Sequence, residues 1–166
     1  DMKTTFTSVI LSVMLLCVCS VHAQPFRTPT LTGNAATNFK ADEKNAAAGV
    51  AYCFTWDTAY MYFGVTGPGA YIKTEPTLIY IDSDPNATPR AGTGDSIGFN
   101  YDNRIASLPF SANFVLYFKD GYAEARTSTA AGTWSTQTTY TSNIVTGTND
   151  IEIRVPWNIL PGGVRP

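Results

Sequence analysis

The chain has little charge and almost no histidine or cysteine. Of its 166 residues, 14% are charged, one is histidine and three are cysteine. So little charge argues against a disordered tail, a coiled coil or a long solvated helix. The 11 Lys and Arg residues form no basic block, and the net charge is −2. A protein that tracks nucleic-acid phosphates needs clustered positive charge, so nucleic acid is not expected as a partner.

Residues 1–23 have the pattern of a secretory signal peptide. Lys3 precedes an apolar run over residues 9–19, which is shorter than the roughly 20 apolar residues that a membrane anchor needs. Small residues follow the run up to Ala23, as is typical of a cleavage site. We expect cleavage after Ala23, a secreted or cell-surface protein, and no membrane insertion afterwards. Lipid attachment to a cysteine of this run is the alternative.

Cleavage would leave Cys53 as the only cysteine and would remove the only histidine, His22. No disulfide could then form within the chain. Catalysis by Ser/His/Asp or Cys/His groups would be excluded, as would histidine-based zinc and haem sites. Cys53 lies among apolar and aromatic residues and is expected to be a small buried side chain. The sequence therefore predicts neither zinc nor haem.

Short runs with a period of two predict an all-β fold. From Val50 to Trp56, large side chains alternate with smaller ones, so that the large ones share one face of a strand. Further strands are predicted over residues 60–65, 77–82, 96–101, 113–119, 122–127 and 151–155. Asp120-Gly121 between two such runs is a strong hairpin signal. Repeated short strands of this kind are typical of an antiparallel β-sandwich similar to a jelly roll.

The predicted module spans residues 50–166 and is preceded by residues 24–49, an N-terminal linker with at most one short strand. The sequence ends in loop-like residues soon after its last predicted strand. We therefore expect the module to lack at least one closing strand. A missing strand would leave a sheet edge exposed, which favours aggregation.

The densest acidic cluster contains Asp82, Asp84 and Asn86, with Asp95 following. Alternating oxygen ligands at the end of a strand could hold a hard cation such as calcium. The full twelve-residue calcium loop is absent, because no Glu closes it. The other interpretation is an acidic turn whose side chains bind backbone amides. Both remain open.

Catalysis is not expected. A glycosidase needs two carboxyl groups at a cleft, one of them protonated because it is buried. The loop aspartates have no apolar neighbours in sequence that would raise a pKa, and Glu75, Glu124 and Glu152 are expected to face solvent. The sequence also has no nucleophile elbow and no phosphate-binding loop.

Aromatic residues make up 13% of the chain. Trp134 lies among small polar residues and is a candidate for stacking on a sugar ring. Tyr101 and Arg104 could supply further contacts to sugar hydroxyls. The alternative for Trp134 is that it covers the core from a loop.

Four segments carry a family resemblance: Phe-Thr-Trp-Asp (54–57), Tyr-Met-Tyr-Phe-Gly-Val (60–65), Tyr-Ile-Asp-Ser-Asp-Pro-Asn (80–86) and Gly-Asp-Ser-Ile (94–97). Over roughly residues 50–160 the chain resembles the family 9 carbohydrate-binding module and related DOMON-like sandwiches. It is also similar to secreted multidomain proteins of Bacteroidetes that carry such modules. The resemblance implies a β-sandwich, calcium in some members, and saccharide binding between Trp side chains.

Within that resemblance, Asp82 and Asp84 match the acidic strand of the family, and Trp134 is the candidate for the sugar clamp. The haem-binding branch uses Met and His ligands; Met61 is present, but no histidine remains after cleavage. We therefore expect a non-catalytic, exported module that binds an oligo- or polysaccharide, with calcium as a candidate ligand and with other domains in the same full-length protein. The alternative is a structural or adhesive spacer without a small ligand.

Overall fold

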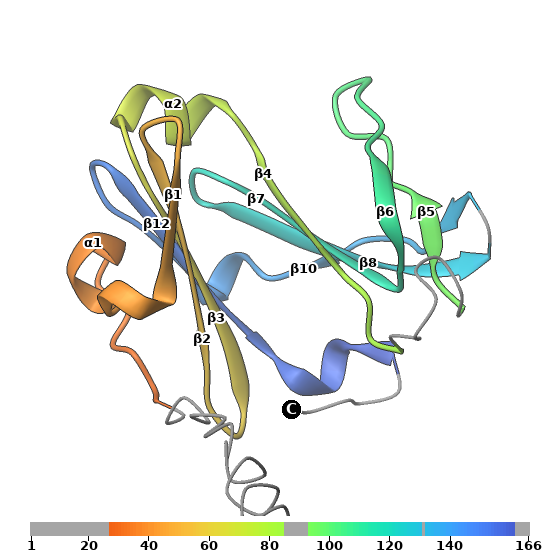
Figure 1. Ribbon diagram of the computed structural model, residues 1–166, viewed down its shortest axis with the longest axis horizontal. Coiled ribbons are helices and arrows are strands. Elements are labelled where there is room, and N and C mark those ends of the chain that lie inside the picture. The colour runs from red at the N-terminus through yellow and green to blue at the C-terminus, as the bar shows by residue number, and fades with distance from the viewer. Residues whose placement is uncertain (1–26, 85–92, 131, 162–166) are drawn as a thin grey trace, which may run out of the picture.

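The computed structural model describes residues 27–84, 93–130 and 132–161, and its main elements are antiparallel β-strands (Figure 1). The expected signal peptide, residues 1–23, and Asn86 lie outside the described residues. The predicted all-β sandwich is confirmed. Of the helices in the described part of the chain, none is long and apolar enough to cross a membrane.

Two main sheets cross each other at a steep angle (Figure 1). The first has the strand order β1-β2-β3-β12-β11. Its strands are β1 (Lys44–Ala47), β2 (Val50–Trp56), β3 (Tyr60–Thr66), β12 (Asp150–Pro156) and β11 (Ile144–Thr146). The second has the order β10-β8-β7-β4, with β9 paired to β8. Its strands are β10 (Thr138–Thr139), β8 (Tyr122–Ala130), β7 (Phe114–Lys119), β4 (Thr77–Ile81) and β9 (Thr133–Trp134).

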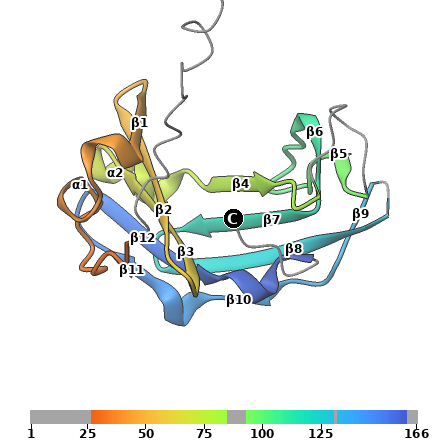
Figure 2. The ribbon, with the colours of Figure 1, turned by 60° about the horizontal axis from the view of Figure 1, so that its bottom comes forward.

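A third sheet and a few short helices connect these strands. The third sheet pairs β5 (Asp95–Ile97) with β6 (Ser107–Ala112). The helices are α1 (Ala35–Asn38) and α2 (Gly69–Thr74), and the 3-10 turns are η1 (Ala41–Glu43), η2 (Thr141–Asn143) and η3 (Trp157–Ile159). In Figure 2, β1 and the β5–β6 pair rise on opposite sides of β4, so β4 lies at the open side of the second sheet.

The core lies between the two main sheets. Alternate residues of β7, Phe114, Leu116 and Phe118, are buried there, as the period of a strand requires. Buried side chains of β3 and β12 belong to the same cluster: Met61, Phe63, Val65, Ile151, Ile153 and Val155. The sequence pattern therefore identified the strands that form the core.

The hairpin predicted at Asp120-Gly121 is confirmed. Lys119, the last residue of β7, pairs with Tyr122, the first residue of β8, so Asp120 and Gly121 form the whole connection between the two strands. Asp120 adopts a φ of 50°, in the left-handed region that Asp and Asn tolerate better than most residues. The short turn fixes the register in which the core residues of β7 face those of β8.

Residues 31–39 pack on the outer face of the first sheet, and β1 extends its edge. Phe39 and Ala35 form a small buried cluster there with Cys53 and Tyr62. Gly64 permits this close approach, because a Cβ at that position would lie 2.7 Å from the Phe39 ring. The free thiol of Cys53 is buried in this cluster, and its burial raises the pKa of the thiol to about 11.

The expectation that Glu152 faces solvent is wrong. Its side chain is fully buried (0% exposed) on the outer face of β12. One carboxylate oxygen accepts hydrogen bonds from the backbone N–H groups of Thr32, Gly33 and Asn34 at 2.8, 2.6 and 3.2 Å. The Asn38 side chain donates to the other oxygen at 2.8 Å. Alternation along β12 predicts that Glu152 faces water. The N-terminal segment covers Glu152 instead, and its hydrogen bonds replace those that water would make.

Arg27 ties the start of the described chain to η1. Its guanidinium donates to the two carboxylate oxygens of Glu43 at 2.7 and 2.5 Å, and the Lys40 N–H adds a third hydrogen bond at 2.7 Å. Burial of Glu43 favours its neutral form, but the hydrogen bonds from Arg27 and Lys40 outweigh it. Together with smaller contributions they lower the pKa of Glu43 from 4.5 to about 2.

Replacing Glu152 by Ala should destabilise the fold by at least ~3 kcal/mol, because several buried backbone donors would lose their acceptor. Urea unfolding followed by circular dichroism measures this. The control is Asp42→Asn at an exposed position of η1, for which the change should stay within about 0.5 kcal/mol. Equal midpoints for Glu152→Ala and the unchanged protein would contradict the role assigned to Glu152.

Stability should fall as the pH drops from about 4.5 towards 2. A carboxylate whose pKa is lower in the folded state stabilises the fold above its unfolded pKa, and this contribution is lost as the pH falls through the folded pKa. Thermal unfolding at several pH values should show a shallower acid slope for Glu43→Gln. The slope should not vanish, because hydrogen bonds to Asp57 also lower its pKa to about 2 against the effect of burial. An unchanged slope in the variant would contradict the assignment.

Candidate functional site

A two-residue turn after β5 brings Tyr101 and Arg104 together. The two residues exchange backbone hydrogen bonds of 3.1 and 2.8 Å. Asp102 and Asn103 between them both have positive φ, 51° and 60°, which two-residue hairpin turns require and Asp and Asn accept. The strand predicted over residues 96–101 is therefore shorter, because β5 ends at Ile97 and the chain then turns back to β6.

This turn forms one wall of a cavity of about 420 Å³, which we call the hairpin cleft. The opposite wall is the outer face of β4 and the residues before it. The lining residues are Glu75, Pro76, Leu78, Tyr80, Tyr101, Asp102, Arg104 and Ala106. Arg104 donates to Glu75 at 3.5 Å, and its side chain is 78% exposed. An ion pair this exposed contributes little to stability, so both groups can turn towards a ligand.

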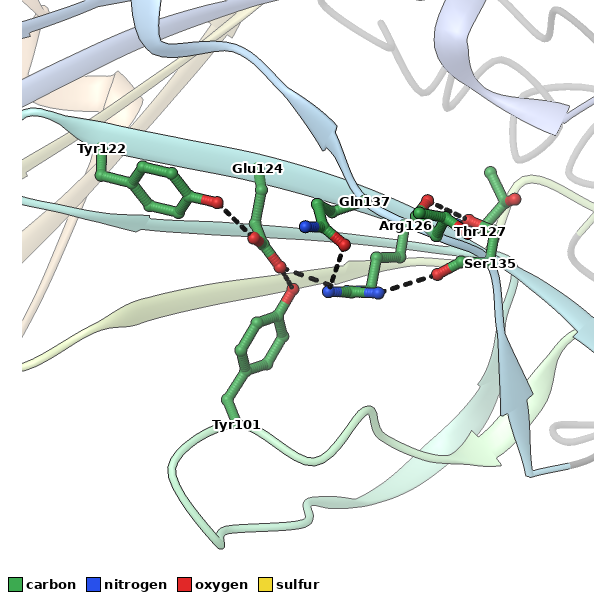
Figure 3. Close-up of polar contacts among 8 residues, drawn as sticks. Tyr101, Tyr122, Glu124, Arg126, Thr127, Ser135 and Gln137 are labelled. Carbon is green, nitrogen blue, oxygen red and sulfur yellow. Dashed lines mark hydrogen bonds and ion pairs between the residues drawn. The ribbon is translucent and has the colours of Figure 1, made fainter.

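A buried carboxylate holds Tyr101 in place (Figure 3). Glu124 of β8 accepts hydrogen bonds from the hydroxyls of Tyr101 and Tyr122 at 2.8 and 2.5 Å. Arg126 donates to the same carboxylate at 3.2 Å. The expectation that Glu124 faces solvent is wrong. The turn that contains Tyr101 lies over the outer face of β8, and the Tyr101 hydroxyl donates a hydrogen bond to the Glu124 carboxylate.

The phenols around Glu124 keep their protons near neutral pH. Burial and the hydrogen bond to Glu124 raise the pKa of Tyr101 well above its usual value. The hydrogen bond to Glu124, aided by burial, raises the pKa of Tyr122 to about 12. Both hydroxyls can therefore act as donors to the carboxylate. Sequence alternation along β8 gave no signal of this network, because its partners come from a distant loop.

Ring contacts fix the orientation of Tyr101 further. Its ring stacks on Tyr117 of β7, with centroids 4.6 Å apart and planes at 22°, and Phe99 packs edge-on at 4.8 Å. Arg126 lies over the Phe99 ring, with its guanidinium carbon 4.0 Å from the ring centroid. Tyr101 therefore presents to the cleft only the part of its ring that Tyr117 and Phe99 leave free.

Trp134 is half-buried on β9. Its ring packs edge-on against Tyr80, with centroids 6.0 Å apart, and its indole N–H donates to the backbone oxygen of Ile97 at 3.2 Å. Tyr80 lines the hairpin cleft, whereas Trp134 is not among the described residues that do so. The structure thus joins Tyr101 and Arg104 in one cavity and places Trp134 next to one of its walls.

The acidic residues make local contacts. Asp82 accepts from the Asp84 N–H at 3.0 Å, and Asp84 accepts from the hydroxyl of Thr93 at 2.8 Å and from its N–H at 3.1 Å. Asp95, expected in a hydrophilic loop, is buried at the start of β5 and accepts from the N–H groups of Ile97 and Gly132. The expectation that Asp95 lies in a hydrophilic loop is therefore wrong, because the segment at Gly132 contacts its carboxylate and the side chain is buried.

These contacts are those of an acidic turn. Burial raises the pKa of Asp82, contrary to the expectation that nothing near it would do so. The Thr93 hydroxyl lowers the pKa of Asp84. No group of three or more metal-binding side chains occurs within the described residues, which do not include Asn86.

A second cavity, of about 520 Å³, lies between β2 and β4, and we call it the aromatic groove. The side chains of Tyr52 and Phe54 on β2 are 43% and 40% exposed there. Phe54 stacks between Trp56 and Phe63, at centroid distances of 5.4 and 5.0 Å. The alternation in β2 correctly placed the large residues on one face. It could not show that this face lies beside an open edge.

The chain matches no family model, no curated protein and no solved structure. Its functional assignment therefore rests on the geometry of its own cavities.

Glu124→Gln should let Tyr101 and Tyr122 ionise at lower pH, because the negative charge that raises their pKa is removed. Absorbance titration of the tyrosines would show this as a shift of part of the signal to lower pH. Glu75→Gln is the matched control, since Glu75 contacts Arg104 and neither phenol. An identical titration for Glu124→Gln and the unchanged protein would contradict the network.

Proposed function

We propose that this protein is an exported, non-catalytic module that binds carbohydrate in the hairpin cleft. The observation that supports this is the combination of groups in one cavity. Leu78, Tyr80 and part of the Tyr101 ring offer apolar surface, while Asp102 and Arg104 offer hydrogen-bonding groups. Sugars present the same pairing, with apolar ring faces and a rim of hydroxyls. The cavity volume of about 420 Å³ falls within the usual range of ligand sites.

The charges in the cleft favour a neutral sugar. Glu75 and Asp102 carry two negative charges against the single positive charge of Arg104. An acidic sugar would have to overcome this excess, whereas neutral hydroxyls can donate to the carboxylates and accept from the guanidinium. Tyr101 contributes a fixed wall, because its hydroxyl is already bound to Glu124.

Binding without catalysis fits the positions of the carboxyl groups of Glu75, Asp102 and Glu124. A glycosidase keeps one carboxyl protonated by burial. Glu75 pairs with Arg104 at the mouth of the cleft, and Asp102 lies exposed on the turn. Glu124 is buried, but two phenols and an arginine occupy its oxygens. None of these three carboxyl groups is both buried and part of the lining of the hairpin cleft.

Trp134 contributes to the site through Tyr80, which it supports from behind. In this proposal the acidic turn at Asp82 and Asp84, with Asn86, is the place where calcium would stabilise the module, whereas Asp95 is buried and already accepts from the N–H groups of Ile97 and Gly132. Other domains of a full-length surface protein would be its covalent neighbours. The second candidate function is a structural spacer. It is favoured by the packing of Tyr101 and Trp134 within the fold, which limits their contact with a ligand.

A glycan array followed by calorimetric titration of the best glycan tests the proposal. Arg104→Ala should weaken binding about tenfold or more, since it removes a hydrogen-bonding group while leaving an exposed position. Arg154→Ala is the matched control, because Arg154 is an exposed arginine on the first sheet that lies over Tyr60. Its affinity should stay unchanged. Titrations with calcium and with a chelator show whether the acidic turn contributes.

If the folded protein binds no glycan, the spacer becomes the better description. If it binds a glycan with equal affinity in Arg104→Ala, the carbohydrate function survives but the hairpin cleft is not its site. Tryptophan fluorescence adds a third readout, because Trp134 touches the wall of the cleft.

A further inference from the structure

The hairpin cleft and the aromatic groove meet at one residue of β4. Leu78 lines both cavities, whose volumes are about 420 and 520 Å³. Glu75 and Tyr80 line the cleft beside it, and Thr77 and Ile79 line the groove. In Figure 2, β4 lies between β1, which borders the groove, and the β5–β6 pair, whose connecting turn forms a wall of the cleft. A ligand that fills one cavity can therefore continue into the other.

The place where the two cavities meet is an open sheet edge. β4 pairs with β7 on one side, and none of the described strands pairs with its other side. Leu78 is half-buried, as are all the residues of β4. The free side of an edge strand presents N–H and C=O groups that need hydrogen-bond partners. The crossing from one cavity to the other thus offers donors and acceptors as well as the apolar side chain of Leu78.

The aromatic groove offers ring surface that the described chain leaves uncovered. Tyr52 and Phe54 are 43% and 40% exposed. The Phe54 ring is held by stacked contacts with Trp56 and Phe63, whose planes lie 29° and 28° from its own. A ring that is already fixed in the free protein loses little entropy when a ligand packs on it. Exposed aromatic rings of fixed orientation suit the apolar face of a sugar ring.

Polar groups border these rings. Asp42 and Asn45 line the groove and are exposed, so both can bind hydroxyl groups. Glu43 pairs with Arg27, and the ammonium of Lys44 donates to a backbone oxygen. The positive charges of Arg27 and Lys44 balance the negative charges of Asp42 and Glu43. A neutral ligand rich in hydroxyls therefore fits this rim, as it fits the hairpin cleft.

The arrangement favours a ligand that crosses the edge of β4 over one that runs along it. An added β-strand pairs along the edge and stays in the plane of the sheet. The two cavities lie on opposite faces of β4 instead, because Tyr80 lines only the cleft and its neighbour Ile79 only the groove. A saccharide chain can bend at the linkages between its units, so that separate units reach the two faces.

We propose that one neutral oligosaccharide chain occupies both cavities and crosses β4 at Leu78, so that the aromatic groove is a second subsite of the carbohydrate site. This inference rests on the proposed function. Sugar units in the hairpin cleft contact Arg104, and units farther along the chain stack on Tyr52 and Phe54. Affinity then rises with chain length until the groove is filled.

Calorimetric titration tests this with neutral oligosaccharides of glucose, xylose, mannose and any further sugar that the glycan array selects, from one to about six units long. Affinity should rise about tenfold or more from the shortest chain that binds to the longest, because only long chains reach the groove. Tyr52→Ala should remove this rise while short chains still bind, and Tyr52→Phe, which keeps the ring, should restore it. Arg104→Ala should weaken the binding of short and long chains alike.

The matched control is Tyr60→Ala. It removes a partly buried tyrosine ring of the first sheet, and Tyr60 is not among the described residues that line either cavity. The rise of affinity with chain length should persist in this variant. Circular dichroism checks that all variants are folded, and Phe54→Leu replaces Tyr52→Ala if that variant unfolds.

The outcomes separate this inference from the function on which it rests. If no glycan binds, the proposed function fails and the inference fails with it. If chains bind with an affinity that does not depend on length, or if the rise persists in Tyr52→Ala, the aromatic groove is not a subsite and the cleft alone binds carbohydrate. If Tyr52→Ala weakens the binding of short chains and Arg104→Ala does not, the groove alone is the site, which also overturns the inference.

Discussion

A buried glutamate on the outer face of each main sheet holds the segment that covers that face. Glu152 on β12 binds the backbone of residues 32–34, and Glu124 on β8 binds the hydroxyl of Tyr101. A carboxylate is costly to bury unless charged or polar partners satisfy it. Each glutamate therefore makes its covering segment necessary, and each segment in turn excludes water from its glutamate.

The two devices have different consequences. Around Glu152, backbone hydrogen bonds and a small buried cluster that contains Phe39 and Cys53 hold the covering segment against the sheet. This face of the first sheet is therefore closed. Around Glu124 the cover is a two-residue turn with an exposed Arg104 beside it. That turn stands away from β4 far enough to leave the hairpin cleft. A buried glutamate that binds a covering segment thus produces a closed face on the first sheet and a candidate binding site on the second.

β4 occupies a special position between these features. Its outer face forms a wall of the hairpin cleft, and its inner face borders the aromatic groove.

The sequence by itself determined the long core strands, because the period of two in β2, β7 and β12 follows directly from the geometry of an extended chain. It did not determine the short ones, such as β5, which ends at Ile97. It also identified the tight turn at Asp120-Gly121. It chose Tyr101 and Arg104 as candidates on chemistry alone, and the structure places both at one cavity. Alternation, however, only tells which residues share a face. It does not tell whether water or another segment covers that face.

Only the tertiary structure decided that second question. Glu124 and Glu152 alternate with core residues just as exposed residues do, but segments distant in sequence bury them both. Tyr52 and Phe54 show the reverse, since they lie on a core-like face and remain exposed beside an open edge. Burial depends on contacts between residues far apart in the chain, and a local pattern carries no information about such contacts.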